Sequence, residues 1–190
     1  MTNLAAVLGR VPKFVLFGAA GLIQIVLIGL MVADRVMILR TGVDVTLQTR
    51  PVDPRDFLRG DYVVLSYDIS TVPAGSPADE LSAERGNPIF VKLAPNRDGF
   101  YQAISVHAAP IDVASPEVLI RGHIAGSFGK TLQVRYGIER YFVPEGEGRT
   151  LENARNRRKL TVIAAVAPTG RAAIKRLLID GEPVYDEPWF

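Results

Sequence analysis

Hydrophobic and polar positions divide the chain into two parts with different patterns. Residues 14–33, FVLFGAAGLIQIVLIGLMVA, contain no charged residue, and Gln24 is their one strongly polar side chain. A helix of this length rises about 30 Å, which matches the hydrocarbon core of a bilayer. A helix that covers a soluble core has a polar face, and this run has none. The pattern therefore predicts a transmembrane anchor helix over residues 14–33.

A cleaved secretory signal is the alternative interpretation of this run. Signal peptides have an apolar stretch of about 7–15 residues, followed by a small-x-small cleavage site. The run is longer than that, and Met31 is a poor partner for Ala33 at a cleavage point. We therefore favour an uncleaved anchor, with residues 1–13 as a cytoplasmic tail and residues 34–190 outside the cytoplasm. Basic residues on the two flanks nearly balance, so this orientation depends on the short basic tail before the anchor.

After the apolar run, the chain changes to short stretches that are typical of β-structure. Val43 to Thr49 alternates apolar and polar residues, which predicts a half-buried strand. A soluble helix is predicted over residues 150–159, and a shorter one within 78–85. The expected fold is mainly β, a small β-sandwich or partly open β-barrel domain with one or two short helices, preceded by a single N-terminal transmembrane helix. The further predicted strands are 62–69, 89–93, 100–106, 118–124, 132–136, 160–167 and 172–179.

Composition excludes several kinds of site. The chain has no cysteine, which rules out disulfides, thiolate metal sites and a cysteine nucleophile. Its two histidines are too few for a typical zinc site unless carboxylates complete it, so we predict no metal and no cofactor. The basic cluster at residues 155–159 is interpreted as a solvated helix end, with contact to anionic lipid as the alternative. We expect no nucleic-acid partner.

The segment 60–67, GDYVVLSY, is the most distinctive string in the chain. Gly60 permits a tight turn, and the Asp61 side chain can accept hydrogen bonds from nearby backbone amides. In the strand that follows, Tyr62 and Val64 point to one face, whereas Val63, Leu65 and Tyr67 point to the other. These residues alone favour a turn that leads into a core strand.

The same string resembles the signature that names the GDYXXLXY family of uncharacterised bacterial membrane-anchored proteins. Residues 136–146, YGIERYFVPEG, are similar to the second block of that family, as are the N-terminal anchor and the region of Asp180 and Gly181. The resemblance implies a bacterial membrane-anchored protein, often associated with a multi-pass membrane protein, and implies no known reaction. Every fixed position of the signature is present: Gly60, Asp61, Tyr62, Leu65 and Tyr67.

The two blocks together carry the residues of a candidate binding pocket. Paired carboxylates can perform acid–base chemistry or bind a cation when their side chains converge. The alternative is a structured turn with a Glu–Arg pair, since ion-pair networks also contain such residues. No recognisable catalytic set is present, so no catalytic residue is assigned. The candidate pocket residues are Asp61, Tyr62, Tyr67, Glu139, Arg140 and Glu145.

The anchor has one side that suits a partner helix. Small residues let helices approach closely, and an amide within the membrane can form a hydrogen bond with a partner. This side carries Gly18, Gly21, Gln24, Ile28 and Gly29. We therefore expect an accessory or interaction protein rather than an enzyme, held in the bacterial inner membrane by one helix, with its C-terminal domain in the periplasm and a multi-pass membrane protein as partner. The alternative function is an extracytoplasmic enzyme, or a small-ligand or cation binder, that uses the carboxylate–tyrosine pocket.

Overall fold

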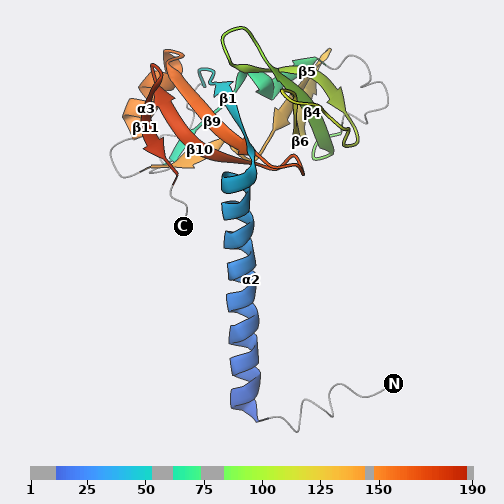
Figure 1. Ribbon diagram of the computed structural model, residues 1–190, viewed down its shortest axis with the longest axis vertical. Coiled ribbons are helices and arrows are strands. Elements are labelled where there is room, and N and C mark those ends of the chain that lie inside the picture. Colours follow the sequence, from blue (N-terminus) through green and yellow to red (C-terminus); the bar gives the residue numbers. More distant parts are fainter. Residues whose placement is uncertain (1–11, 53–61, 74–83, 144–147, 188–190) are drawn as a thin grey trace. The chain divides into compact units, whose positions relative to one another are not determined.

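The computed structural model describes residues 12–52, 62–73, 84–143 and 148–187. The chain forms two compact units, residues 1–37 and residues 38–189, which are described separately. The first contains most of helix α2 (Lys13–Thr41), which is drawn in blue in Figure 1. Within the described residues, α2 is the one helix long and apolar enough to cross a membrane. An N-terminal apolar helix is thus confirmed, with the length of a membrane anchor or of a signal sequence.

Helix α2 continues eight residues beyond the predicted end at Ala33. Its last turn belongs to the second unit, where Ile38 and Leu39 are buried against Ala165 and Ala173. This apolar contact explains the extension, because packing stabilises helical turns that composition alone would not.

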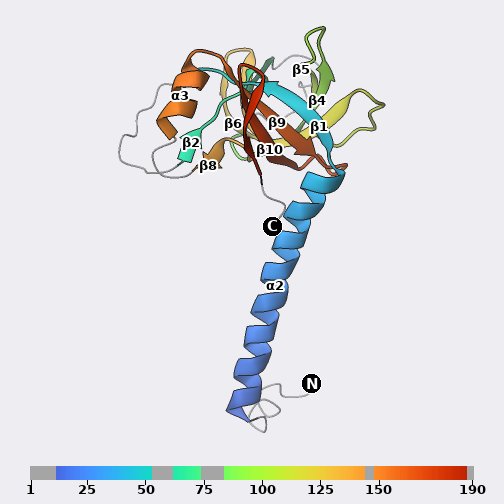
Figure 2. The same ribbon diagram turned by 60° about the vertical axis from the view of Figure 1, so that its left-hand side comes forward.

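The second unit is mainly β, and 44% of the residues that the structure describes are strand. One sheet has the strand order β1-β9-β10-β11, a second pairs β2 with β8, and a third, nearly closed and barrel-like, has the order β3-β7-β6-β4-β5. Figure 1 shows β9 beside β10, and Figure 2 shows helix α3 next to β2. The strands are β1 (Val43–Gln48), β2 (Tyr62–Val64), β3 (Thr71–Pro73), β4 (Pro88–Pro95), β5 (Tyr101–His107), β6 (Val118–Phe128), β7 (Thr131–Arg135), β8 (Arg140–Phe142), β9 (Leu160–Val166), β10 (Ala172–Ile179) and β11 (Glu182–Asp186); α3 spans Gly148–Asn156, and the 3-10 helix η1 spans Asp68–Ser70.

One continuous apolar core joins the sheets. In β1, Val45 and Leu47 are fully buried and alternate with more exposed residues, as the sequence pattern predicts. These two residues belong to the same buried cluster as Ile120 on β6 and Val162 on β9. The predicted mainly β fold class, preceded by an N-terminal apolar helix, is therefore confirmed.

The predicted strand over residues 62–69 is shorter in the structure. Strand β2 ends at Val64; Leu65 still bonds to the residue before β8, but Ser66 bonds instead to the segment after β1. The backbone N–H of Leu65 donates to the carbonyl of Glu139, and the N–H of Arg50 donates to the carbonyl of Ser66. The chain then turns into η1. The predicted helix over residues 150–159 begins at Gly148 and ends at Asn156, and most of the segment 78–85 lies outside the described residues.

Candidate functional site

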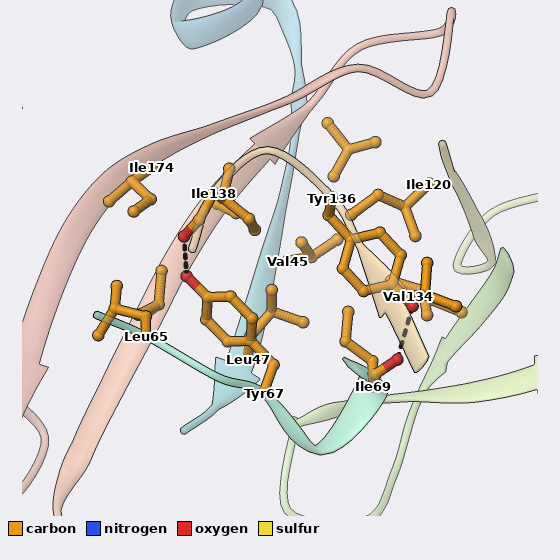
Figure 3. Close-up of a cluster of buried hydrophobic side chains, with 14 of the residues drawn as sticks. Val45, Leu47, Leu65, Tyr67, Ile69, Ile120, Val134, Tyr136, Ile138 and Ile174 are labelled. Carbon is orange, nitrogen blue, oxygen red and sulfur yellow. Dashed lines mark hydrogen bonds between the residues drawn. The ribbon is translucent and has the colours of Figure 1, made fainter. Parts of the chain in front are cut away.

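The last tyrosine of the 60–67 motif, Tyr67, is completely buried. Its hydroxyl donates a hydrogen bond to the backbone carbonyl of Ile138 over 2.5 Å, as Figure 3 shows. Its backbone N–H donates to the hydroxyl oxygen of Ser70 over 3.1 Å, which fixes the corner where η1 begins. The Tyr67 phenol therefore joins the first motif to the second block, 71 residues later in the chain.

Tyr136 makes the reciprocal connection. Its hydroxyl donates to the carbonyl of Ile69 over 2.6 Å. The ring occupies space that Gly122 on β6 leaves open, since a Cβ at that glycine would lie 2.5 Å from the side chain of Val134 and 3.0 Å from Tyr136 Cδ1. Two hydroxyl-to-carbonyl bonds thus run in opposite directions between the second block and the end of the first motif with the residues just after it. We call this arrangement the tyrosine clasp, formed by Tyr67, Ile69, Tyr136 and Ile138.

Glu139 stabilises the turn that carries one side of the clasp. Its carboxylate accepts a hydrogen bond from the backbone N–H of Tyr136 over 2.5 Å and another from that of Gly137 over 3.0 Å. Gly137 has φ +84°, a backbone conformation that residues with a Cβ rarely adopt. The carboxylate therefore acts as a hydrogen-bond acceptor that holds the 136–139 turn in shape.

Both phenols of the clasp are held in the protonated form. Burial raises the pKa of Tyr67 well above its ordinary value of 10.0, and the negative charge of Glu139 raises it further. The same two causes, in the same order, raise the pKa of Tyr136. Because only a protonated phenol can donate to a carbonyl, these shifts favour the clasp. They also disfavour either tyrosine as a phenolate base or nucleophile near neutral pH.

We expect the clasp to make the protein less stable in alkali. A phenol with a raised pKa in the folded state contributes full stability below the unfolded pKa of about 10, and loses it as pH rises towards the folded pKa. For Tyr67 and Tyr136 together, the free energy of unfolding should fall by up to about 2.7 kcal/mol per pH unit above pH 10. Urea unfolding between pH 9 and 11 measures this slope. The Tyr67→Phe/Tyr136→Phe double variant should show a shallower slope, and an equal slope would contradict the assignment.

The other face of β2 and β8 carries exposed aromatic and basic side chains. Tyr62 pairs in register with Phe142, and Val64 with Arg140. The Tyr62 and Phe142 ring centroids lie 5.9 Å apart, and the Arg140 guanidinium carbon lies 5.8 Å from the Tyr62 centroid. These distances suit aromatic and cation–π contacts. The Phe142 side chain is nevertheless 76% exposed. We call these four residues the outer patch: Tyr62, Val64, Arg140 and Phe142.

The described candidate pocket residues fall into two groups. Tyr67 and Glu139 lie at the clasp, where one hydroxyl and one carboxylate already have backbone partners. Tyr62 and Arg140 lie together on the outer patch. The two remaining candidates, Asp61 and Glu145, lie outside the described residues. Within the described ranges, no group of three histidine, aspartate or glutamate side chains is arranged to hold a metal ion.

Arg155 is a structural residue that the sequence interpretation placed incorrectly at a solvated helix end. It is 1% exposed, and its guanidinium donates to the carbonyl of Val64 over 2.5 Å and to that of Val52 over 3.3 Å. Two further N–H groups donate to Asn156 Oδ1. Burial lowers the pKa of Arg155, and nearby Glu152 partly opposes the shift. Arg155 therefore connects α3 to β2 and to the segment that follows β1.

The predicted partner face of the anchor is open in the first unit. A Cβ added at Gly18, Gly21 or Gly29 meets no atom within 4 Å. Ile28 on the same side is 53% exposed, and the side chain of Gln24 is exposed as well. Among the described residues, Gln24 has no hydrogen-bond partner for its amide. This helix face is therefore sterically free to receive a neighbouring helix.

Fold and site together define a class of protein: a mainly β domain that follows an apolar N-terminal helix and is held together by paired tyrosine motifs. A family model, described as GDYXXLXY protein, matches residues 24–177, which is most of the chain. The chain belongs to this family, as the resemblance of its motifs predicts. No curated protein and no solved structure matches it.

Proposed function

We propose that the protein is an accessory subunit anchored in the bacterial inner membrane, where it binds a multi-pass membrane protein. Residues 14–33 cross the bilayer once, residues 1–13 lie in the cytoplasm and the β domain lies in the periplasm. Gly18, Gly21, Gln24, Ile28 and Gly29 contact the partner within the membrane. The outer patch contacts its periplasmic side.

The observation that carries this proposal is that each of the two family motifs has side chains on an inner face and side chains on an outer face. Tyr67 and Tyr136 point inward and form the clasp, whereas Tyr62, Val64, Arg140 and Phe142 point outward and form the outer patch. Protein interfaces are enriched in tyrosine, phenylalanine and arginine, which are the residue types of the patch. With Glu139 engaged in a turn, the described residues favour a contact surface over a catalytic cleft.

The anchor supplies independent support. An amide side chain is unfavourable in hydrocarbon unless it finds a partner, and glycines on the same side allow close helix approach. Gln24 and the glycines at 18, 21 and 29 meet both conditions for a helix contact. One helix that offers such a face is suited to docking against a larger helical bundle.

A pull-down of the tagged full-length protein from mild detergent tests the proposal. Wild type should retain a multi-pass membrane protein, and Gln24→Leu should weaken retention by about 3-fold to 20-fold, the range expected for one hydrogen bond between membrane helices. Val26→Leu, a similarly small change on the opposite side of the helix, is the matched control and should retain the partner. Phe142→Ser should lower retention through the outer patch. A protein that is solitary in every sample would contradict the accessory role.

A further inference from the structure

An apolar groove of about 790 Å³ lies in the second unit, and none of its lining residues belongs to the clasp or the outer patch. Its walls come from the start of β1, from β4 and β5, from the loop 110–117 and from the β9–β10 turn. A volume of this size falls within the range of about 300–1,000 Å³ that is usual for small-molecule sites. The groove is therefore large enough for a ligand and is separate from the surfaces already described.

The lining of the groove suits a hydrocarbon ligand. Val43 and Ile111 are 54% and 37% exposed, although both are large apolar residues. The carboxylate of Glu117 forms an ion pair with Lys92 at 3.0 Å, so its charge is balanced locally. Asp112 also lines the groove, and no described residue forms an ion pair with it. An extended apolar molecule fits this surface better than a polar metabolite, which needs several fixed hydrogen-bond partners.

The position of the groove in the chain makes the membrane an available source of such a ligand. Thr41, the last residue of α2, lines the groove and follows the end of the apolar run at Ala33 by eight residues. Even a fully extended segment of that length spans at most about 28 Å. With residues 14–33 in the bilayer, the groove lies within this reach of the lipid surface.

We propose that the groove binds an acyl chain of a phospholipid from the membrane that holds the anchor. This inference rests on the membrane anchoring proposed above. Exposed Val43 and Ile111 contact the hydrocarbon chain and are shielded from water by it.

Photo-cross-linking in vesicles tests the inference. The full-length protein is reconstituted into phosphatidylcholine vesicles that contain a phosphatidylcholine with a diazirine on its acyl chain, and cross-linked peptides are identified by mass spectrometry. We expect cross-links in residues 14–33 and in 110–118. Ile111→Glu should lower the 110–118 signal about fivefold or more, whereas Ile111→Leu should preserve it. Ile104→Glu is the matched control, because Ile104 is 57% exposed on β5 and does not line the groove.

The outcomes separate this inference from the proposed anchoring. Cross-links in 14–33 without cross-links in 110–118 would overturn the groove inference and support the anchor. So would a 110–118 signal that Ile111→Glu leaves unchanged, or an equally strong signal around Ile104, since either indicates unspecific surface labelling. Absence of cross-links in 14–33 would overturn the anchoring itself. Circular dichroism of each variant establishes that the β domain is folded.

Discussion

Replacing Tyr67 by alanine is expected to lower the free energy of unfolding by about 3–5 kcal/mol, the range for removal of a buried aromatic side chain. The ring is fully buried, and its hydroxyl is the donor to the Ile138 carbonyl. Tyr67→Phe keeps the ring and leaves this carbonyl without its donor, which should cost about 1–3 kcal/mol. Urea unfolding of the full-length protein in micelles, followed by circular dichroism, measures both differences.

The matched control for Tyr67→Phe is Tyr62→Phe, in the same motif. Tyr62 lies on the outer patch, so loss of its hydroxyl should change stability by less than about 0.5 kcal/mol. Tyr136→Phe should resemble Tyr67→Phe, because Tyr136 donates to the Ile69 carbonyl in the reciprocal way. Equal losses for Tyr62→Phe and Tyr67→Phe would contradict the division of the motif into an inner and an outer side.

Arg155→Met is expected to lower the free energy of unfolding by about 2–4 kcal/mol. Methionine fills the space of the arginine methylene chain and part of that of the guanidinium, but it donates no hydrogen bonds. The carbonyls of Val64 and Val52 therefore lose their donor. Arg155→Lys should recover only part of this loss, since one ammonium group cannot reproduce the planar fork that reaches separate acceptors. Thermal and urea unfolding of the three proteins provide the comparison.

Arg157→Met is the control for the Arg155 series. Arg157 is exposed near the end of α3, and its replacement should leave stability within about 0.5 kcal/mol of wild type. Similar losses at the two arginines would indicate an effect of overall charge rather than of the hydrogen bonds to β2. A selective loss at Arg155 would establish it as the connection between α3 and the first motif.

The alternation of side chains between the two faces of a strand predicts part of the site correctly. Alternation along residues 62–67 places Val63, Leu65 and Tyr67 on one side, and the structure buries all three. The same rule places Tyr62 and Val64 together on the opposite face, where the outer patch lies. Side-chain direction follows from local backbone geometry, so local sequence is sufficient for this part.

The hydrogen-bond and strand partners of these residues cannot be predicted from the local sequence pattern. Tyr67 bonds to a backbone carbonyl 71 residues away, and every residue type offers the same carbonyl. Strands β3 and β8 have three residues each, which is too short for an apolar–polar period to appear. Arg155 did carry a signal that the sequence interpretation missed. It follows Leu151 by four residues and so lies on the buried face of α3 with Leu151 and Ala154.

Strand β1 also determines when the domain can fold during synthesis. β1 lies at a sheet edge, and within the described part of the chain its one strand partner is β9, from Val43 with Val166 to Gln48 with Thr161. At about 5–20 residues per second, a ribosome needs roughly 6 to 24 s between these strands. Throughout that interval, the segment immediately after helix α2 lacks its partner strand in the sheet. The domain therefore completes its fold only after β9 has been made, and until then the β1 segment lacks the strand with which it pairs in the folded sheet.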